Sequence, residues 1–204
     1  MGGIDEARAS FERDARRLVG RTVKGVRYWD VHNFSDEPRV WDYGVWHHAV
    51  MGVELETERY PFTITWTNRF YPYGVEVFEE PISRHLLLGE NGPEGWDASA
   101  SDRWQALLGV KVQGVEVHWE RIDLGPAVRL SDGAQVGPAE SHDVPVAMRL
   151  DLGQDLVWFV AGIPQWPDMD KVFVMGDEIM VVFEPEKLVG MGFPSNDFSA
   201  APGG

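Results

Sequence analysis

The feature that most constrains the fold of this chain is the alternation of apolar and polar residues in GVELETERYPFTITWTN, residues 52–68. In its first half Val53 and Leu55 alternate with glutamates, and in its second half apolar residues alternate with Thr63 and Thr65. Successive side chains of a β strand point to opposite faces, so a period of two separates a buried face from a wet one. The stretch therefore predicts a β hairpin with one face in water.

A second stretch of the chain resembles the first. The segment LVGRTVKGV (18–26) matches LLGVKVQGV (107–115) at an offset of 89 residues. Each copy is followed by strand-like patterns, which continue in the first half as GVEVFEE (74–80). We interpret this as an internal duplication. The expected fold class is mainly β (α+β), with antiparallel sheets in two similar β-rich lobes.

The predicted domain organisation follows this repeat. Residues 1–90 form an N-terminal helix and the first lobe, 91–101 a Gly- and acid-rich linker loop, 102–191 the second lobe, and 192–204 a flexible tail. The helix is amphipathic over residues 4–19, because its apolar residues recur at helical spacing. The two lobes can also pack as one compact domain.

Two stretches of the second half are apolar on both faces and predict central, covered strands. They are LVWFVAG (156–162) and IMVVF (179–183). A turn is expected near Gly176-Asp177, joining two strands of a final hairpin.

The charge of the chain is strongly acidic and unevenly distributed. The net charge is −15; residues 1–27 carry seven basic and four acidic groups, and the remainder carries 11 basic and 29 acidic groups. Such a surface repels a phosphate backbone and attracts a basic partner, so we expect a basic protein partner and no nucleic acid. The chain has no cysteine and no apolar run long enough to span a bilayer. These features favour a cytoplasmic protein of bacterial type with no membrane association.

Common enzyme signatures are missing from the sequence. It contains no phosphate-binding loop, dinucleotide-binding glycine motif, nucleophile elbow or H-E-x-x-H zinc motif. We therefore expect a binding protein in preference to an enzyme, and no cofactor.

Histidines and carboxylates concentrate in residues 27–50, RYWDVHNFSDEPRVWDYGVWHHAV. Two interpretations stay open for this segment. In the first, its tryptophans pin a loop onto the fold. In the second, it binds a divalent transition metal or forms the centre of a metal-dependent enzyme, since imidazole and carboxylate suit such ions. The candidate ligands are His32, His47, His48, Asp30 and Asp42.

An acidic and aromatic surface of the first lobe is the leading functional hypothesis, because tyrosine and tryptophan dominate protein interfaces. By its size, acidity, lack of cysteine and aromatic loops the chain resembles immunity proteins as a class, although no specific motif carries that resemblance. The resemblance implies an inhibitor-like role towards a basic partner. The candidate binding residues are Trp41, Tyr43, Trp46, Glu54, Glu56, Tyr71 and Tyr73.

Overall fold

The computed structural model describes residues 2–30, 40–70, 73–86 and 92–191. The helices and 3-10 turns are α1 (Gly2–Ala15), η1 (Arg16–Leu18), η2 (Ile82–Arg84), α2 (Asp102–Gln105) and α3 (Pro185–Gly190). The strands are β1 (Val23–Asp30), β2 (Trp46–Val50), β3 (Gly52–Thr57), β4 (Phe62–Thr67), β5 (Gly74–Phe78), β6 (Glu94–Asp97), β7 (Gly114–Leu124), β8 (Glu140–Leu152), β9 (Asp155–Gln165) and β10 (Asp168–Val182).

Within the described ranges, ten strands form one curled sheet in the order β5-β4-β3-β1-β2-β10-β9-β8-β7, and β6 adds to β1 outside this path. Pairing is antiparallel throughout, except that β1 and β2 are parallel. The prediction of a mainly β fold with an N-terminal helix is confirmed. The strand β6 lies in the segment that the sequence assigned to a linker.

The internal duplication is not confirmed, but its two matched segments contact each other. Gly20 N–H donates to the carbonyl of Val112 at 2.8 Å, and Gly109 N–H donates to the carbonyl of Val23 at 2.8 Å. The two bonds are equivalent in the repeat, because Gly20 corresponds to Gly109 and Val23 corresponds to Val112. Both glycines have a left-handed backbone, with φ of +84° and +82°. The two segments are thus joined antiparallel, with Thr22 opposite Lys111.

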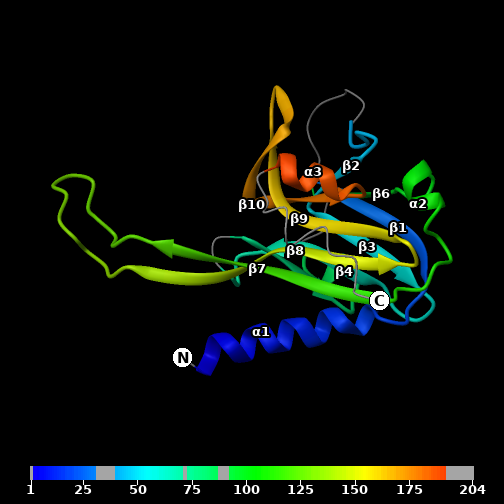
Figure 1. Ribbon diagram of the computed structural model, residues 1–204, viewed down its shortest axis with the longest axis horizontal. Helices are drawn as coiled ribbons and strands as arrows, with labels where there is room; N and C mark the ends of the chain where they lie inside the picture. Colours follow the sequence, from blue (N-terminus) through cyan, green and yellow to red (C-terminus); the bar gives the residue numbers. More distant parts are fainter. Residues whose placement is uncertain (1, 31–39, 71–72, 87–91, 192–204) are drawn as a thin grey trace.

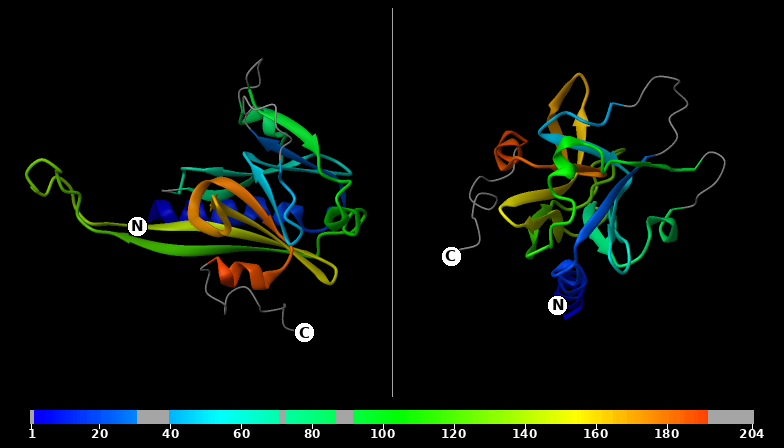
Figure 2. Two further views of the ribbon diagram at one scale, coloured as in Figure 1. Left: turned by 90° about the horizontal axis from the view of Figure 1, so that it is seen from above. Right: turned by 90° about the vertical axis from the view of Figure 1, so that its right-hand side faces the viewer.

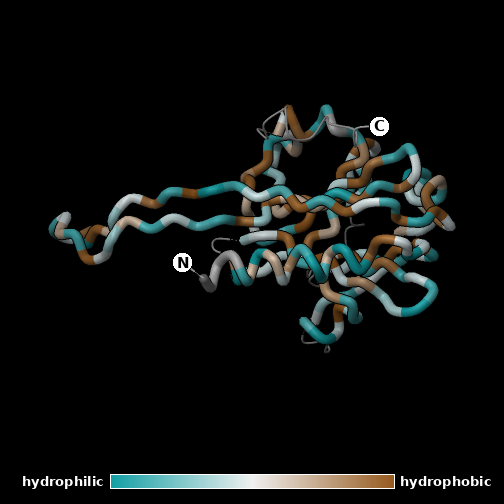
Figure 3. Tube along the Cα trace, turned by 60° about the horizontal axis from the view of Figure 1, so that its bottom comes forward, coloured by the Kyte–Doolittle hydropathy of each residue, from teal (hydrophilic) through white to brown (hydrophobic). Residues whose placement is uncertain are grey.

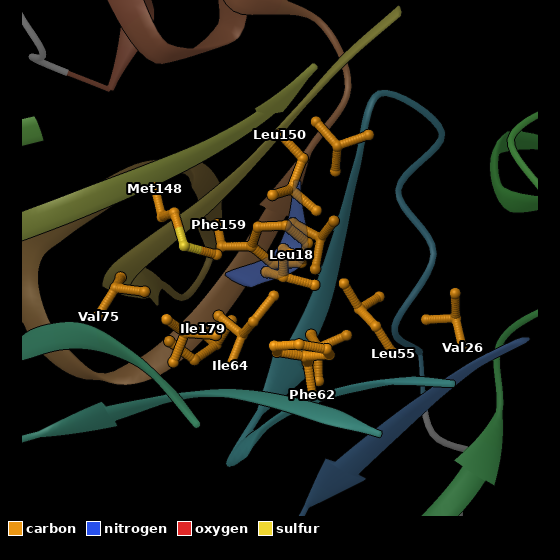
Figure 4. Packing of buried hydrophobic residues seen from close by; sticks show 14 of the residues in the cluster. Leu18, Val26, Leu55, Phe62, Ile64, Val75, Met148, Leu150, Phe159 and Ile179 are labelled. Carbon is orange, nitrogen blue, oxygen red and sulfur yellow. The ribbon is translucent and has the colours of Figure 1, made fainter. Parts of the chain in front are cut away.

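The main core lies between the two halves of the curled sheet. Met148 of β8 and Phe159 of β9 share one buried cluster with Phe62 and Ile64 of β4, and Figure 4 shows these side chains facing one another. The helix α1 packs along the sheet, as Figure 1 shows, and inserts the buried Phe11. Burying apolar area of this kind is the dominant favourable contribution to folding.

The hairpin of β3 and β4 forms as the alternation predicts, but the expected wet face of β4 is wrong. Thr63 and Thr65 are buried beside Phe62 and Ile64. Each hydroxyl donates to a backbone carbonyl, Thr63 to Glu80 at 2.7 Å and Thr65 to Met51 at 2.6 Å. A buried hydroxyl is tolerated when it is hydrogen-bonded, so threonine at an alternating position does not by itself predict exposure.

The turn predicted near Gly176-Asp177 is also wrong. The strand β10 runs continuously through these residues, and its pairing with β9 shifts register between Val174 and Ile179. A Cβ at Gly176 would lie 2.3 Å from the Ile163 side chain. The glycine therefore permits a bulge close to β9, which the sequence pattern does not distinguish from a turn.

The hairpin of β7 and β8 projects from the body of the molecule as a long arm (Figures 1 and 2). Its tip, residues 125–139, is exposed almost throughout. The tip carries exposed aliphatic side chains, and Leu130 is 100% exposed. Figure 3 shows hydrophilic and hydrophobic residues mixed along the arm, whereas hydrophobic ones gather in the strands of the body. No helix in the described part of the chain is long and apolar enough to cross a membrane.

Candidate functional site

The turn before β2 holds Trp41 and Asp42 in fixed positions. The Asp42 carboxylate accepts a hydrogen bond from Gly44 N–H at 2.8 Å, and Gly44 adopts φ of +81°. The carbonyl of Trp41 accepts from His48 N–H at 2.7 Å. An aspartate followed by a left-handed glycine two residues later is a usual turn arrangement, so the local sequence accounts for this geometry.

Beneath the turn lies a buried polar chain of three side chains. Trp104 Nε1–H donates to the Tyr28 hydroxyl at 2.5 Å, and the hydroxyl lies 2.8 Å from His47 Nδ1. The indole nitrogen only donates, so the Tyr28 oxygen accepts from Trp104, and the direction of the bond between Tyr28 and His47 follows the tautomer of His47. His47 Nε2 lies 3.4 Å from Asp42 Oδ1, without hydrogen-bond geometry.

Burial sets the protonation states of Tyr28 and His47 in this hydrogen-bonded group. It lowers the pKa of His47 to about 4, although the Asp42 carboxylate acts in the opposite direction. Burial also raises the pKa of Tyr28 well above its ordinary value. At neutral pH both groups are uncharged. Tyr28 and His47 are both fully buried, and Trp41 packs against both rings.

Two tryptophans rest on this buried chain. Trp41 contacts His47 edge to face at 5.0 Å between ring centroids and contacts Tyr28 at 5.5 Å. Trp96 of β6 contacts Tyr28 at 5.9 Å with perpendicular rings. The two indoles face each other at 6.1 Å and 54°. Together with Glu94 and Gly95 they line a cavity of about 210 Å³ that opens to the surface.

We call Trp41, Asp42, Glu94 and Trp96 the aromatic–acidic face. Asp42 and Glu94 are both exposed, and the two tryptophans are half-buried. Alternate residues of a strand share a face, which places Glu94 beside Trp96 on β6. This arrangement combines π faces with carboxylates, the two groups that attract organic cations.

The other predicted aromatic residues of this segment lie apart from the cavity. Trp46 of β2 is 1% exposed and belongs to a second core cluster. Tyr43 stacks on Trp46 with 4.2 Å between ring centroids. Both side chains pack against the fold more than they face solvent.

The remaining predicted binding residues are spread over the sheet. Glu54 of β3 accepts a hydrogen bond from Ile82 N–H at 2.9 Å, which fixes the segment after β5. Glu56 is exposed on the same strand, opposite Gly25. Tyr73 packs edge to face on Trp66. Tyr71 lies outside the described residues.

The proposed metal ligands meet only in part. His47 and Asp42 are 3.4 Å apart, but His48 Nε2 bonds the Glu178 carboxylate on β10 at 2.8 Å. Asp30 is buried at the end of β1, and His32 lies outside the described residues. Among the residues that the structure describes, no three His, Asp or Glu side chains are grouped closely enough to hold a metal ion. The metal hypothesis stays a prediction.

Sequence reasoning missed Glu94, Trp96, Tyr28 and Trp104 as members of this site. The first two fall in GENGPEGWDASAS (89–101), which reads as a loop because it is rich in Gly, Ser and acidic residues. The short strand β6 exists because its backbone pairs with β1, Tyr28 opposite Trp96. Trp96, the single tryptophan in this segment, was the one feature of the sequence that could have indicated the site.

No protein-family model, no curated protein and no solved structure matches this chain, so its function is inferred from the residues described above.

Proposed function

We propose that this chain is a non-catalytic cytoplasmic bacterial protein-interaction module whose acidic and aromatic surface engages a basic protein partner, in an inhibitor-like role. The observation that carries the proposal is the aromatic–acidic face, where two half-buried indoles meet beside the exposed carboxylates of Asp42 and Glu94. Tryptophan contacts of this kind dominate the energetics of protein interfaces.

The overall charge supports a basic partner. A net charge of −15 raises the association rate with a basic protein and opposes binding to nucleic acid. Asp42 directly follows Trp41 in the sequence, and one residue separates Glu94 from Trp96. Charge and aromatic contact area therefore coincide, which suits an interface in which the carboxylates orient the partner and the indoles supply the contact.

The proposal is tested by titrating the protein with an oligo-arginine peptide and measuring the Kd by calorimetry at low and high salt. The double variant Asp42→Asn, Glu94→Gln is expected to weaken binding at least about tenfold at low salt, because two charge-assisted contacts are lost. The matched control is Asp123→Asn, Glu140→Gln on the arm, which removes the same net charge.

The control separates a specific face from general acidity. If the two double variants weaken binding equally, the peptide responds to net charge alone and the proposed face is wrong. If the peptide does not bind at low salt, an acidic interaction surface for basic partners is excluded.

A further inference from the structure

A cavity of about 350 Å³ lies beside α2 and shares no lining residue with the aromatic–acidic face. Among the described residues, its floor consists of Ala106, Leu107, Leu156 and Phe183, and its rim carries the charged side chains of Asp102, Arg103 and Asp155. We infer that this cavity binds a small organic amine, in which a primary ammonium is carried on an apolar body.

The floor of the cavity is apolar and continuous with the main core. Leu107 is 4% exposed and belongs to the main core cluster, against which the half-buried Phe183 packs. Small-molecule sites are concave and mostly apolar, with volumes of about 300–1,000 Å³. The volume and the lining therefore suit a ligand with an apolar body, in preference to a simple ion.

The aromatic part of the floor is held in place from below. The Phe183 ring lies 5.4 Å from the Trp104 ring and 4.8 Å from the His47 ring, measured between centroids, with an edge-to-face arrangement in both pairs. Trp104 and His47 are fully buried. Little ordering of the Phe183 side chain therefore accompanies binding, which favours affinity.

Two carboxylates at the rim determine the charge of the ligand. Asp102 lies in α2, Asp155 begins β9, and both residues are exposed. Among the described residues, no side-chain hydrogen bond or ion pair holds either carboxylate. An ammonium group has three donors that rotate about its C–N bond, so it can serve carboxylates on two separate elements. The rim therefore favours a primary ammonium.

The Arg103 side chain also lines the cavity, but its charge is already engaged. Its Nε donates to the carbonyl of Gly44 at 2.8 Å, and its Nη2 donates to the Glu184 carboxylate. The guanidinium also lies 5.9 Å from the centroid of the Phe183 ring. Because Glu184 offsets the charge of Arg103, the two aspartates give the cavity an overall negative charge, which opposes an anionic ligand.

The test uses three probes of similar shape on the full chain: 2-phenylethylamine, the neutral 2-phenylethanol and the anionic 3-phenylpropionate. Binding is followed through the methyl signals of Leu107 and Leu156 in carbon-13 NMR. We expect saturable binding of the amine with a Kd on the order of millimolar. The alcohol should bind about fivefold more weakly, since exposed ion pairs contribute modestly, and the anion more weakly still.

A double variant isolates the carboxylates. Asp102→Asn, Asp155→Asn is expected to weaken the amine about fivefold and to leave the alcohol unchanged, so that the two probes bind equally. The matched control is Asp123→Asn, Glu140→Gln on the arm, which removes the same net charge and should preserve the preference for the amine. Equal loss in the two double variants would mean that the amine responds to net charge alone and would overturn the site.

A bulky substitution tests the floor. Ala106→Phe, at an exposed position of the lining, should fill the cavity and weaken the amine and the alcohol at least about tenfold. Ala134→Phe, at an exposed position on the arm, should change neither, and thermal unfolding checks that both variants are folded. No binding of the amine, equal binding of amine and alcohol to the unaltered chain, or unchanged binding in Ala106→Phe would overturn the inference. None of these results bears on the basic protein partner, because the aromatic–acidic face is unchanged in every variant.

Discussion

The Tyr28 hydroxyl lies 2.8 Å from His47 Nδ1, and neither side chain is exposed to water. The bond joins β1 to β2, and Trp104 of α2 completes it by donating to the same hydroxyl. Three elements from both halves of the chain thus meet at one oxygen atom. The stability of this contact, and of the aromatic–acidic face above it, is open to direct measurement.

Replacing Tyr28 with Phe is expected to lower the free energy of unfolding by about 2–4 kcal/mol. The change leaves His47 Nδ1 and Trp104 Nε1 buried without their partner, and an unsatisfied buried group costs about 1–3 kcal/mol. Urea denaturation measures the loss. Tyr60→Phe is the control, because Tyr60 is 58% exposed and its change should cost less than about 0.5 kcal/mol. Equal effects of the two changes would refute the role of the buried hydroxyl.

The stability of the fold is expected to fall as the pH is lowered from about 6.5 to about 4. The pKa of His47 is about 4 in the folded state and about 6.5 when unfolded, so only the unfolded chain takes up a proton in this window. Above the window neither state is protonated at His47, and below it both are. The loss attributable to His47 is at most about 3 kcal/mol.

The pH dependence is measured as the free energy of unfolding at a series of pH values. His47→Gln should reduce the slope between pH 4 and 6.5, since the ionisable group is gone. His142→Gln, at a partly exposed position on the arm, should leave most of the slope in place. An unchanged slope in His47→Gln would show that other groups cause the acid sensitivity.

Gly20→Ala and Gly109→Ala are expected to destabilise the fold by similar amounts, about 1 kcal/mol each. Both residues have positive φ, which a residue with a Cβ adopts only with strain, and nothing lies within 4 Å of either Cβ position. The cost is therefore conformational and not steric. Thermal unfolding of the two variants tests this, with Gly125→Ala as a control at an uncrowded glycine whose φ lies outside the left-handed region. A loss at one site alone would argue against equivalent roles.

Shortening the arm is expected to leave the body of the fold intact. Leu124 pairs with Glu140 at the end of the β7–β8 ladder, so replacing residues 125–139 with Asn-Gly closes the hairpin with a two-residue turn. The tip is exposed and its hydrogen bonds join residues within 125–139, so the free energy of unfolding should change by less than about 1 kcal/mol. A large loss, measured by urea denaturation, would mean that the tip supports the core.

Several elements of this fold follow from the sequence because their causes are local. The period of two in residues 52–68 predicts the β3–β4 hairpin, and the helical spacing of apolar residues predicts α1. The apolar stretch at 156–162 predicts a covered strand, and β9 is buried there. In each case neighbouring side chains determine which face is apolar, and no distant contact is needed.

The site is less predictable, because its members come from β1, the turn before β2, β2, β6 and α2. Trp41 stands out in the sequence for its aromatic surroundings, but Trp46 stands out equally and belongs to the core. The two tryptophans differ because Trp46 packs against buried residues of the second half of the chain, whereas Trp41 packs against the other core cluster. Glu94 and Trp96 carry no periodic signal, since a four-residue strand is too short to show one.

The acidic charge, the mainly β character and the β3–β4 hairpin of this protein follow from residue type and from spacing along the chain. Only the tertiary structure decided that both halves join one sheet, that Thr63 and Thr65 are buried, and that Trp41 meets Trp96. The physical reason is that burial and ring contacts depend on which distant backbone pairs with which. That choice is made by the whole core and not by any one segment.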